Sequence, residues 1–290
     1  MFGGSPPHTG PNGFADFVAF AYFPFPTEAT RGAMSDPLDA ARIAALCPTF
    51  EIEVHARLDS TQERARGRLR EGRREPAAVF ADSQSAGRGQ HGRVWQSPPG
   101  AGLYCTVLWP SARPLLAQVG ASLVAGLAVR AALTGFGVDA RLKWPNDVWL
   151  RGRKLGGILI EALGTDAGST LLVGIGLNVA LPAGTVIDQP WVDLAALGPP
   201  PPRALLAGAL LRRLHEHLTR FEHSGFAGFE EEWAAADALA GRPVRLRGAG
   251  GDETGQALGV DALGRLRILQ DGRVLVYAAG EASIRETDDV

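Results

Sequence analysis

A glycine-rich, cationic stretch, GRGQHGR (87–93), is the part of the chain best suited to hold an anion. Its three glycines let the backbone approach a ligand closely and present N–H groups to it. Arg88 and Arg93 add fixed positive charge and paired donors that match a phosphate or a carboxylate. The spacing fits neither the G-x-x-x-x-G-K-[ST] loop nor a dinucleotide G-x-G-x-x-G that opens a helix. The stretch alone therefore predicts an anion-binding loop, with a flexible surface turn as the alternative.

A second polar cluster lies in KWPNDV (143–148), where a proline makes the chain turn. Lys143, Asn146 and Asp147 are concentrated at this predicted turn. Asp147 is a candidate magnesium ligand, because Mg²⁺ commonly uses one or two carboxylates together with phosphate oxygens of a substrate. A hairpin turn with an Asn-Asp tip is the structural alternative.

Two further segments place polar side chains at the ends of predicted strands. In RKLGGILIE (153–161), Lys154 precedes a pair of glycines, which suggests a ligand lying against the backbone. Its ammonium would neutralise a carboxylate or an α-phosphate there. In GIGLNV (174–179), Asn178 follows a buried run and could donate to a ligand. The alternatives are a bulge with a solvent-facing lysine and an ordinary strand-end turn.

The elements that must position these groups alternate between the strand period and the helical period. A short helix is expected at 37–47 and a strand at 51–58, after which Ser60 or Thr61 suits a helix N-cap. The helix that follows carries arginines at positions 64, 66, 68 and 70, mixed with glutamates. We expect these arginines to form a solvated face, not a nucleic-acid site.

The rest of the chain is rich in predicted strands. They are expected at 77–82, 102–109 (followed by Pro110), 140–150, 153–163 and 169–180. The apolar stretch 115–137 has helical spacing and is predicted to be a buried helix, not a membrane span. A Pro-rich linker (197–203) leads to a helical region, and short strands follow Gly241. The pattern indicates an α+β fold.

Three regions are predicted along the chain. Residues 1–35 are Gly/Pro-rich and aromatic, without the basic start of a signal peptide, and are expected to be a poorly ordered extension. Residues 36–238 would form the domain that carries the motifs, and residues 239–290 a small all-β domain. The net charge of −2 excludes wholesale attraction to nucleic acid or membrane. Cys47 and Cys105 fit no metal or disulfide spacing and suit a reducing compartment.

Taken together, the motifs resemble one family, the biotin protein ligases, also called biotin–acetyl-CoA-carboxylase ligases. Five motifs follow one another in that family's order and spacing: DST (59–61), SQSAGRGQHGRVW (83–95), KWPNDV (143–148), RKLGGILIE (153–161) and GIGLNV (174–179). The resemblance covers about residues 48–290. It implies a central mixed sheet with helices, as in class II synthetases and biotin–lipoyl ligases, followed by a C-terminal SH3-like domain.

The resemblance also implies an activity. These enzymes use ATP and Mg²⁺ to convert biotin into biotinyl-5′-AMP, then pass biotin to one lysine of a biotin carboxyl carrier domain. We therefore expect a cytoplasmic enzyme without a membrane segment and without specific DNA binding, since no paired amphipathic helices with a basic recognition helix precede the first strand. The sequence leaves open whether the chain forms a homodimer.

By resemblance, each motif receives a role. Arg88 and Lys154 are the catalytic residues that face the biotin carboxylate and the α-phosphate, and Asp147 is the magnesium ligand. The expected biotin contacts are Ser60, Thr61, Gln84, Gly87, Arg88, Lys154 and Gly157. The expected contacts to ATP or the adenylate are Arg88, Arg93, Trp95, Lys143, Asn146, Asp147, Asn178 and Trp191.

The chain departs from the family pattern at two positions. Gln90 stands where the family often has an arginine, which removes one cation near the carboxylate. Gln62 stands where an asparagine is usual, at the edge of the biotin pocket. Two other functions stay open at this point. One is a lipoate or octanoate ligase on the same fold, and the other is a non-catalytic anion- or nucleic-acid-binding module that uses the arginines of 64–74.

Overall fold

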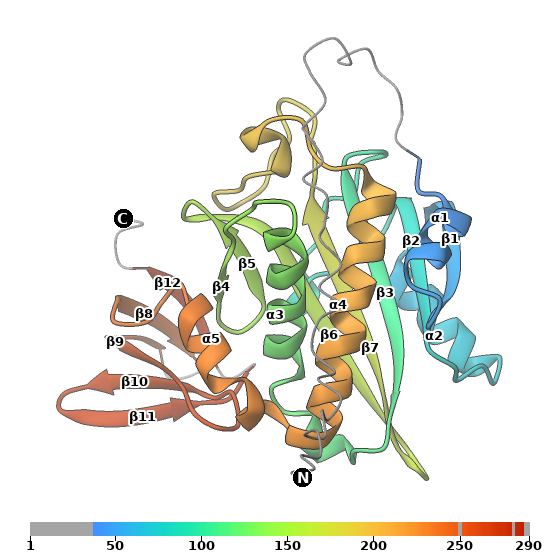
Figure 1. Ribbon diagram of the computed structural model, residues 1–290. Helices are drawn as coiled ribbons and strands as arrows, with labels where there is room; N and C mark the ends of the chain where they lie inside the picture. The colour runs from blue at the N-terminus through green and yellow to red at the C-terminus, as the bar shows by residue number, and fades with distance from the viewer. Residues whose placement is uncertain (1–36, 249–250, 280–281, 287–290) are drawn as a thin grey trace, which may run out of the picture. The chain divides into compact units, whose positions relative to one another are not determined.

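Seven strands form a mixed sheet in the computed structural model, which describes residues 37–248, 251–279 and 282–286 (Figure 1). The predicted extension at 1–35 lies outside the described residues. The strand order is β1-β2-β3-β7-β6-β5-β4, with β1 and β2 parallel and every other pair antiparallel. The bounds are β1 Glu51–Leu58, β2 Ala77–Gln84, β3 Gly102–Ser111, β4 Arg141–Lys143, β5 Asp147–Leu150, β6 Arg153–Thr165 and β7 Gly168–Asn178.

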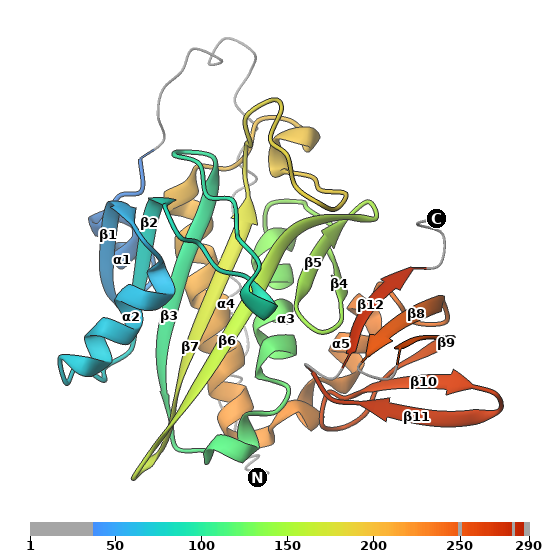
Figure 2. The ribbon, with the colours of Figure 1, turned by 180° about the vertical axis from the view of Figure 1, so that it is seen from behind.

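Helices cover both faces of this sheet. On one face lie α3 (Ala121–Thr134) and α4 (Arg203–Ser224), with α1 (Ala40–Leu46) against α4 (Figure 1). On the other lies α2 (Thr61–Arg70), seen in Figure 2. Side chains alternate along a strand, so β2 sends Phe80 into the large core and Val79 into a smaller cluster under α2. Burial on both faces explains why β2 has an unbroken apolar run.

The predicted buried helix is confirmed in position. A 3₁₀ turn, η3 (Leu115–Gln118), leads into α3, whose side chains form much of the large core. By length and composition, Leu115–Thr134 could cross a bilayer, but 56% of its most apolar window is buried inside the fold. An apolar helix in the centre of a core needs no membrane to bury its side chains.

The C-terminal part is an antiparallel sheet in the order β11-β10-β9-β8-β12. Along the chain, the segment from β7 to β8 contains, besides α4, three short elements: η4 (Leu194–Leu197), η5 (Phe226–Phe229) and α5 (Glu230–Ala236). The strands are β8 Pro243–Gly248, β9 Gly251–Val260, β10 Leu266–Gln270, β11 Arg273–Tyr277 and β12 Ala282–Glu286. The predicted α+β class is confirmed, and this sheet is consistent with an SH3-like tail. The division between residues 238 and 239 stays a prediction.

Two details of the predicted strands are wrong. The segment 140–150, predicted as one strand, is the hairpin β4–β5, in which Lys143 pairs with Asp147, so the hairpin turn named as the alternative for KWPNDV is present. Pro145 has no amide hydrogen to continue a ladder, so the chain reverses there. Pro110, expected after the end of a strand, lies inside β3. It is tolerated because β2 stops pairing at Leu108, which leaves that end of β3 with a partner on one side only.

The expected solvated face of α2 is wrong at Arg68, whose side chain is fully buried. Its guanidinium donates to the carboxylates of Glu51 and Glu53 on β1. The sequence pattern of α2 did not reveal this burial, because the glutamates that satisfy the arginine belong to another element. Arg64, nearby, also donates to Glu53, at 2.8 Å.

Candidate active site

The N-terminus of α2 forms one wall of the candidate site. Of the two residues predicted as the N-cap, Ser60 takes that position and Thr61 begins the helix, and the Ser60 hydroxyl accepts from the N–H of Gln62 at 3.2 Å. The N–H of Thr61 donates to Oε1 of Gln84 on β2 at 2.8 Å. Ser60 and Thr61 are both buried. The structure thus brings together three residues that the sequence assigned to biotin.

Residues that the sequence analysis missed extend this polar wall. The hydroxyl of Thr106, on β3, lies 2.9 Å from Oγ1 of Thr61 and 3.1 Å from Oε1 of Gln62. Ser97 accepts from Nε2 of Gln84 at 2.9 Å. Gln62 itself is buried and donates to a backbone carbonyl of β7. Only the strand register brings Thr106 under α2, so no local motif could have identified it.

Two glycines form a flat surface beside this wall. Gly157 on β6 and Gly176 on β7 are direct register partners, and we call this pair the glycine floor. The indole of Trp95 lies on it: a Cβ on Gly176 would overlap the ring, and one on Gly157 would stand 3.3 Å from it. The indole N–H is buried without a hydrogen-bond partner in the described part of the chain. The absence of side chains therefore opens space for one flat group above the sheet.

The GRGQHGR stretch, here named the cationic loop (87–93), lies in the connection between β2 and β3. Figure 2 shows this connection, in teal, on the same face of the sheet as α2. The loop is closed by hydrogen bonds from Gly89 N–H to Arg93 O at 2.7 Å and from Trp95 N–H to Gly87 O at 2.9 Å. A Cβ on Gly87 would stand 2.6 Å from the Trp95 carbonyl oxygen, so this position requires glycine.

The cations of the loop are exposed. Among the described residues, neither Arg88 nor Arg93 has a carboxylate within ion-pair distance. The loop therefore presents its positive charge to solvent or to a ligand. This is the arrangement expected of an anion-binding loop.

Lys154 lies at the edge of the glycine floor. Its Nζ is 2.7 Å from Oδ1 of Asp147 and 5.6 Å from the centroid of the Trp95 ring, and both charged side chains are mostly buried. Asp147 is the register partner of Gly157, which fixes its position next to the floor. The KWPNDV and RKLGGILIE motifs therefore meet through one ion pair.

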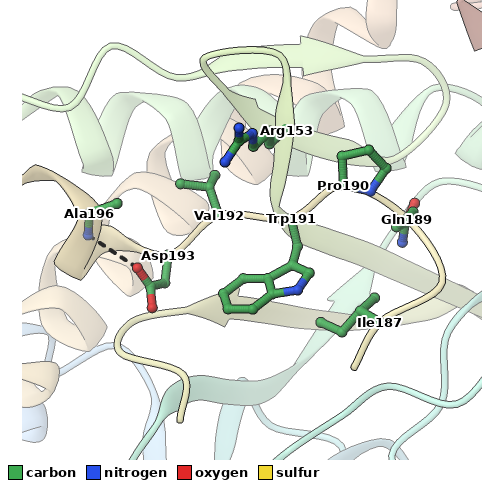
Figure 3. A pocket seen from close by; sticks show the side chains of 8 residues that line it. All are labelled: Arg153, Ile187, Gln189, Pro190, Trp191, Val192, Asp193 and Ala196. Atoms are coloured by element: carbon green, nitrogen blue, oxygen red, sulfur yellow. Dashed lines mark hydrogen bonds between the residues drawn. The ribbon is translucent and has the colours of Figure 1, made fainter. Parts of the chain in front are cut away.

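A short segment beside the start of β6 brings Trp191 next to Lys154. The N–H of Lys154 donates to Pro190 O at 3.1 Å, and the N–H of Val192 donates to Lys154 O at 3.0 Å. Trp191 lines a cavity of about 560 Å³ (Figure 3). The other lining residues are Arg153, Ile187, Gln189, Pro190, Val192, Asp193 and Ala196.

Three predicted nucleotide contacts take part in interactions within the protein. Nδ2 of Asn146 donates to Ile158 O at 2.8 Å, and Nδ2 of the buried Asn178 donates to Val192 O at 3.1 Å. The Lys143 ammonium lies 4.5 Å from the centroid of the Trp149 ring. Asn146 thus links the turn before Asp147 to β6, which carries Lys154. Asn178 links the end of β7 to the segment that carries Trp191.

A magnesium ion at this site would need oxygen ligands from a bound substrate, because Asp147 is paired with Lys154. Asp147 supplies one carboxylate, and the described residues contain no cluster of three His, Cys, Asp or Glu side chains. Mg²⁺ is commonly held by one or two carboxylates and by substrate phosphates, so this donor set fits a metal that arrives with a nucleotide.

Comparison with known proteins identifies the family to which this chain belongs. Residues 54–178 match the family model of the Biotin/lipoate A/B protein ligase family, and residues 240–285 match the Biotin protein ligase C terminal domain. The chain is 36% identical over 255 residues to the bifunctional ligase/repressor BirA of Salmonella typhimurium, which covers 87% of this chain and 79% of that protein. The chain belongs to the biotin protein ligase family.

Other biotin protein ligases support this membership over similar lengths. A biotin–[acetyl-CoA-carboxylase] ligase of Paracoccus denitrificans is 37% identical over 239 residues, or 77% of this chain and 97% of that protein. The structure of the Aquifex aeolicus biotin protein ligase in complex with biotin and ATP aligns with a TM-score of 0.71 at 32% identity, over 82% of this chain and 99% of that one. The resemblance inferred from the five motifs is therefore confirmed.

Proposed function

We propose that this chain is an ATP-dependent ligase that makes biotinyl-5′-AMP and transfers biotin to a lysine of a biotin carboxyl carrier domain. One observation carries the proposal. The polar wall at α2, the glycine floor, the cationic loop and Lys154 lie together on one face of the sheet. The polar wall suits the ureido ring of biotin, the glycine floor carries the Trp95 indole that would cover the ligand, and the cationic loop and Lys154 suit a carboxylate and a phosphate.

In the first step, an oxygen of the biotin carboxylate attacks the α-phosphorus of ATP, and the bond to pyrophosphate breaks. Two anions must come together, and negative charge grows on the phosphoryl oxygens. Lys154 and Arg88 would stabilise both anions, with Lys154 exchanging part of its contact with Asp147 for the ligand. Ser60, Thr61 and Gln84 would bind the biotin ureido group, and Trp191 would stack on adenine.

The mixed anhydride formed in this step is easily hydrolysed, so water must be kept away from it. The cationic loop and Trp95 would cover it, with Arg93 closing over the phosphate. Magnesium, brought by the nucleotide and held by Asp147, would neutralise further phosphate charge.

In the second step, the amine of the carrier lysine attacks the acyl carbon. An amide bond forms, AMP leaves, and the attacking nitrogen loses a proton. This step needs a transient protein interface, and we propose that a sheet edge provides it.

A transfer assay tests the proposal. The protein is incubated with biotin, MgATP and a carrier domain, and the product is detected with streptavidin. Lys154→Ala should abolish formation of the adenylate, while Arg88→Ala should form it slowly and release it early. Failure of the parent protein to biotinylate the carrier would reject the function.

The lipoate or octanoate alternative can be separated in the same assay. Pyrophosphate release is compared with biotin, lipoate and octanoate as the acid. The match to the biotin protein ligase C-terminal domain favours biotin. Faster release with lipoate than with biotin would favour the alternative.

We further propose a cytoplasmic enzyme without sequence-specific DNA binding. Two buried free cysteines support a reducing compartment. A specific gel shift with a biotin operator would contradict the expected lack of DNA binding. Sedimentation with and without biotin and ATP would decide between a monomer and a homodimer.

A further inference from the structure

The end of the β2–β3 connection that leads back into the sheet is held by side chains. The backbone pairing of β2 with β3 stops at Ala81 and Tyr104. Beyond this point, the N–H of Gln84 donates to Ser97 O at 3.2 Å, and two side chains of β2 also hold the returning chain. Gln84 donates to Ser97, and Oδ2 of Asp82 accepts from the N–H of Gly100 at 3.1 Å. The end of the connection that carries the cationic loop is thus tied to β2 at two points.

Asp82 is in turn held by a buried cation. Nη2 of Arg203, the first residue of α4, lies 2.8 Å from Oδ1 of Asp82, and Nη1 donates to the carbonyl oxygen of Gly102 at 3.3 Å. Arg203 is only 4% exposed. One guanidinium therefore links α4 to β2 and to the first residue of β3, on either side of Gly100.

The position of this arginine is unfavourable for the helix itself. The N-terminus of a helix carries partial positive charge, which disfavours a cation in its first turn. Burial adds a desolvation cost that only good pairing offsets. The arginine at this point therefore serves the connection between segments more than the stability of α4.

A neighbouring contact fixes the same turn. The hydroxyl of Tyr104 donates to Pro98 O at 3.3 Å. Burial raises the pKa of Tyr104, so the hydroxyl stays protonated and remains a donor. Residues 97–102 are thereby fixed, whereas Arg88 and Arg93 of the cationic loop stay exposed.

We propose that Arg203 and Asp82 are a positioning pair for the cationic loop. Neither residue needs to touch the ligand. The pair fixes one end of the connection so that, when the loop closes, Arg88 and Trp95 return to one geometry above the glycine floor. This inference rests on the proposed function for one point, which is that the anion bound by the loop is the adenylate.

The test measures how long the adenylate is retained. The parent, Arg203→Met and Asp82→Asn are loaded with biotin and MgATP without a carrier, and release of the adenylate is followed after a chase. Release should accelerate on the order of tenfold in both variants, because small displacements of groups that position a reactant have large effects. Arg203→Lys keeps the charge but cannot reach both acceptors, so its release rate should be intermediate.

A second measurement needs no ligand. Trypsin should cleave the variants after Arg88 and Arg93 faster than it cleaves the unliganded parent. Arg213→Met is the matched control, since Arg213 forms an exposed ion pair with Glu216 on the same helix, and it should change neither rate. If single variants fold poorly, Asp82→Leu combined with Arg203→Met replaces the pair by apolar side chains and should still show fast release and cleavage.

The outcomes are distinguishable. A parent that forms no adenylate would reject the proposed function, while the trypsin rates would still report on the pair. Folded variants with a lower melting temperature but with parental release and cleavage rates would show a merely structural ion pair and overturn the inference.

Discussion

Two arginine-rich segments of this chain, α2 and the cationic loop, look alike in composition and differ in how their charges are met. In α2, each of Arg64, Arg66, Arg68 and Arg70 forms an ion pair with a glutamate. In the loop, Arg88 and Arg93 have no carboxylate partner among the described residues. The partners of a cation, not its presence in the sequence, separate a structural charge from one kept for a ligand.

The ion pairs between α2 and β1 shift the pKa values of the groups that form them. Burial works against ionisation of Glu53, but hydrogen bonds from Arg64, His55 and Arg68 outweigh it and lower its pKa to about 2. The hydrogen bond to Glu51 raises the pKa of Arg68. These charges stabilise the fold through each other, so little of their field is left for an external anion.

The largest effect is expected from the loop. Arg88→Ala should lower the rate of adenylate formation by about 10²–10³-fold, as does loss of one preorganised donor at a developing negative charge. The melting temperature should hardly change, because the side chain is exposed. Pyrophosphate release and calorimetry measure the two quantities. A strongly destabilised Arg88→Ala would break the distinction between the two segments.

The reverse pattern is expected for the buried arginine of α2. Arg68→Met should lower the free energy of unfolding by about 2 kcal/mol, less than for a fully buried pair because Glu51 is half exposed and Glu53 keeps its pairing with Arg64. Urea denaturation measures this change. Adenylate formation at 20 °C should remain parental, and a loss as large as that of Arg88→Ala would contradict the assigned structural role.

Acid should lower the free energy of unfolding through the ion pairs between α2 and β1, and the cationic loop should not contribute to this change. Because the folded-state pKa of Glu53 is below its ordinary value of 4.5, its stabilising contribution is complete above about pH 4.5 and is lost as the pH falls towards 2. Glu53→Gln should therefore flatten the fall of unfolding free energy over this range. Arg88→Ala should leave the slope unchanged, so equal slopes for Glu53→Gln and the parent would refute this account.

The smallest effect is expected at the exposed end of α2. Arg70 pairs with Glu63 at 3.2 Å, but its side chain is 63% exposed. Arg70→Ala should change stability by less than about 0.5 kcal/mol and leave activity unaffected. A clear loss of nucleotide or nucleic-acid binding in this variant would revive the reading of α2 as a binding face.

Local sequence patterns predicted much of the fold, and the motifs named most of the residues of the candidate site. The Ser60 cap and the apolar helix α3 follow from spacing and side-chain chemistry within a few residues. The strand period did not separate β4 from β5, because both strands are too short for a period to show, and only the proline and the Asn-Asp pair indicated the turn between them. The burial of Arg68 was missed because its partners lie on β1.

Residue types and their spacing were enough to specify the chemistry: a glycine-rich loop with two arginines, a lysine before paired glycines, and the five motifs that identify the family. Which of these groups come into contact depends on how the sheet and the helices pack. Sheet register pairs Gly157 with Gly176 and brings Thr106 under Thr61, and α4 brings Arg203 to Asp82. Such contacts join residues up to 121 positions apart, and a local pattern cannot specify them because they depend on how distant elements pack.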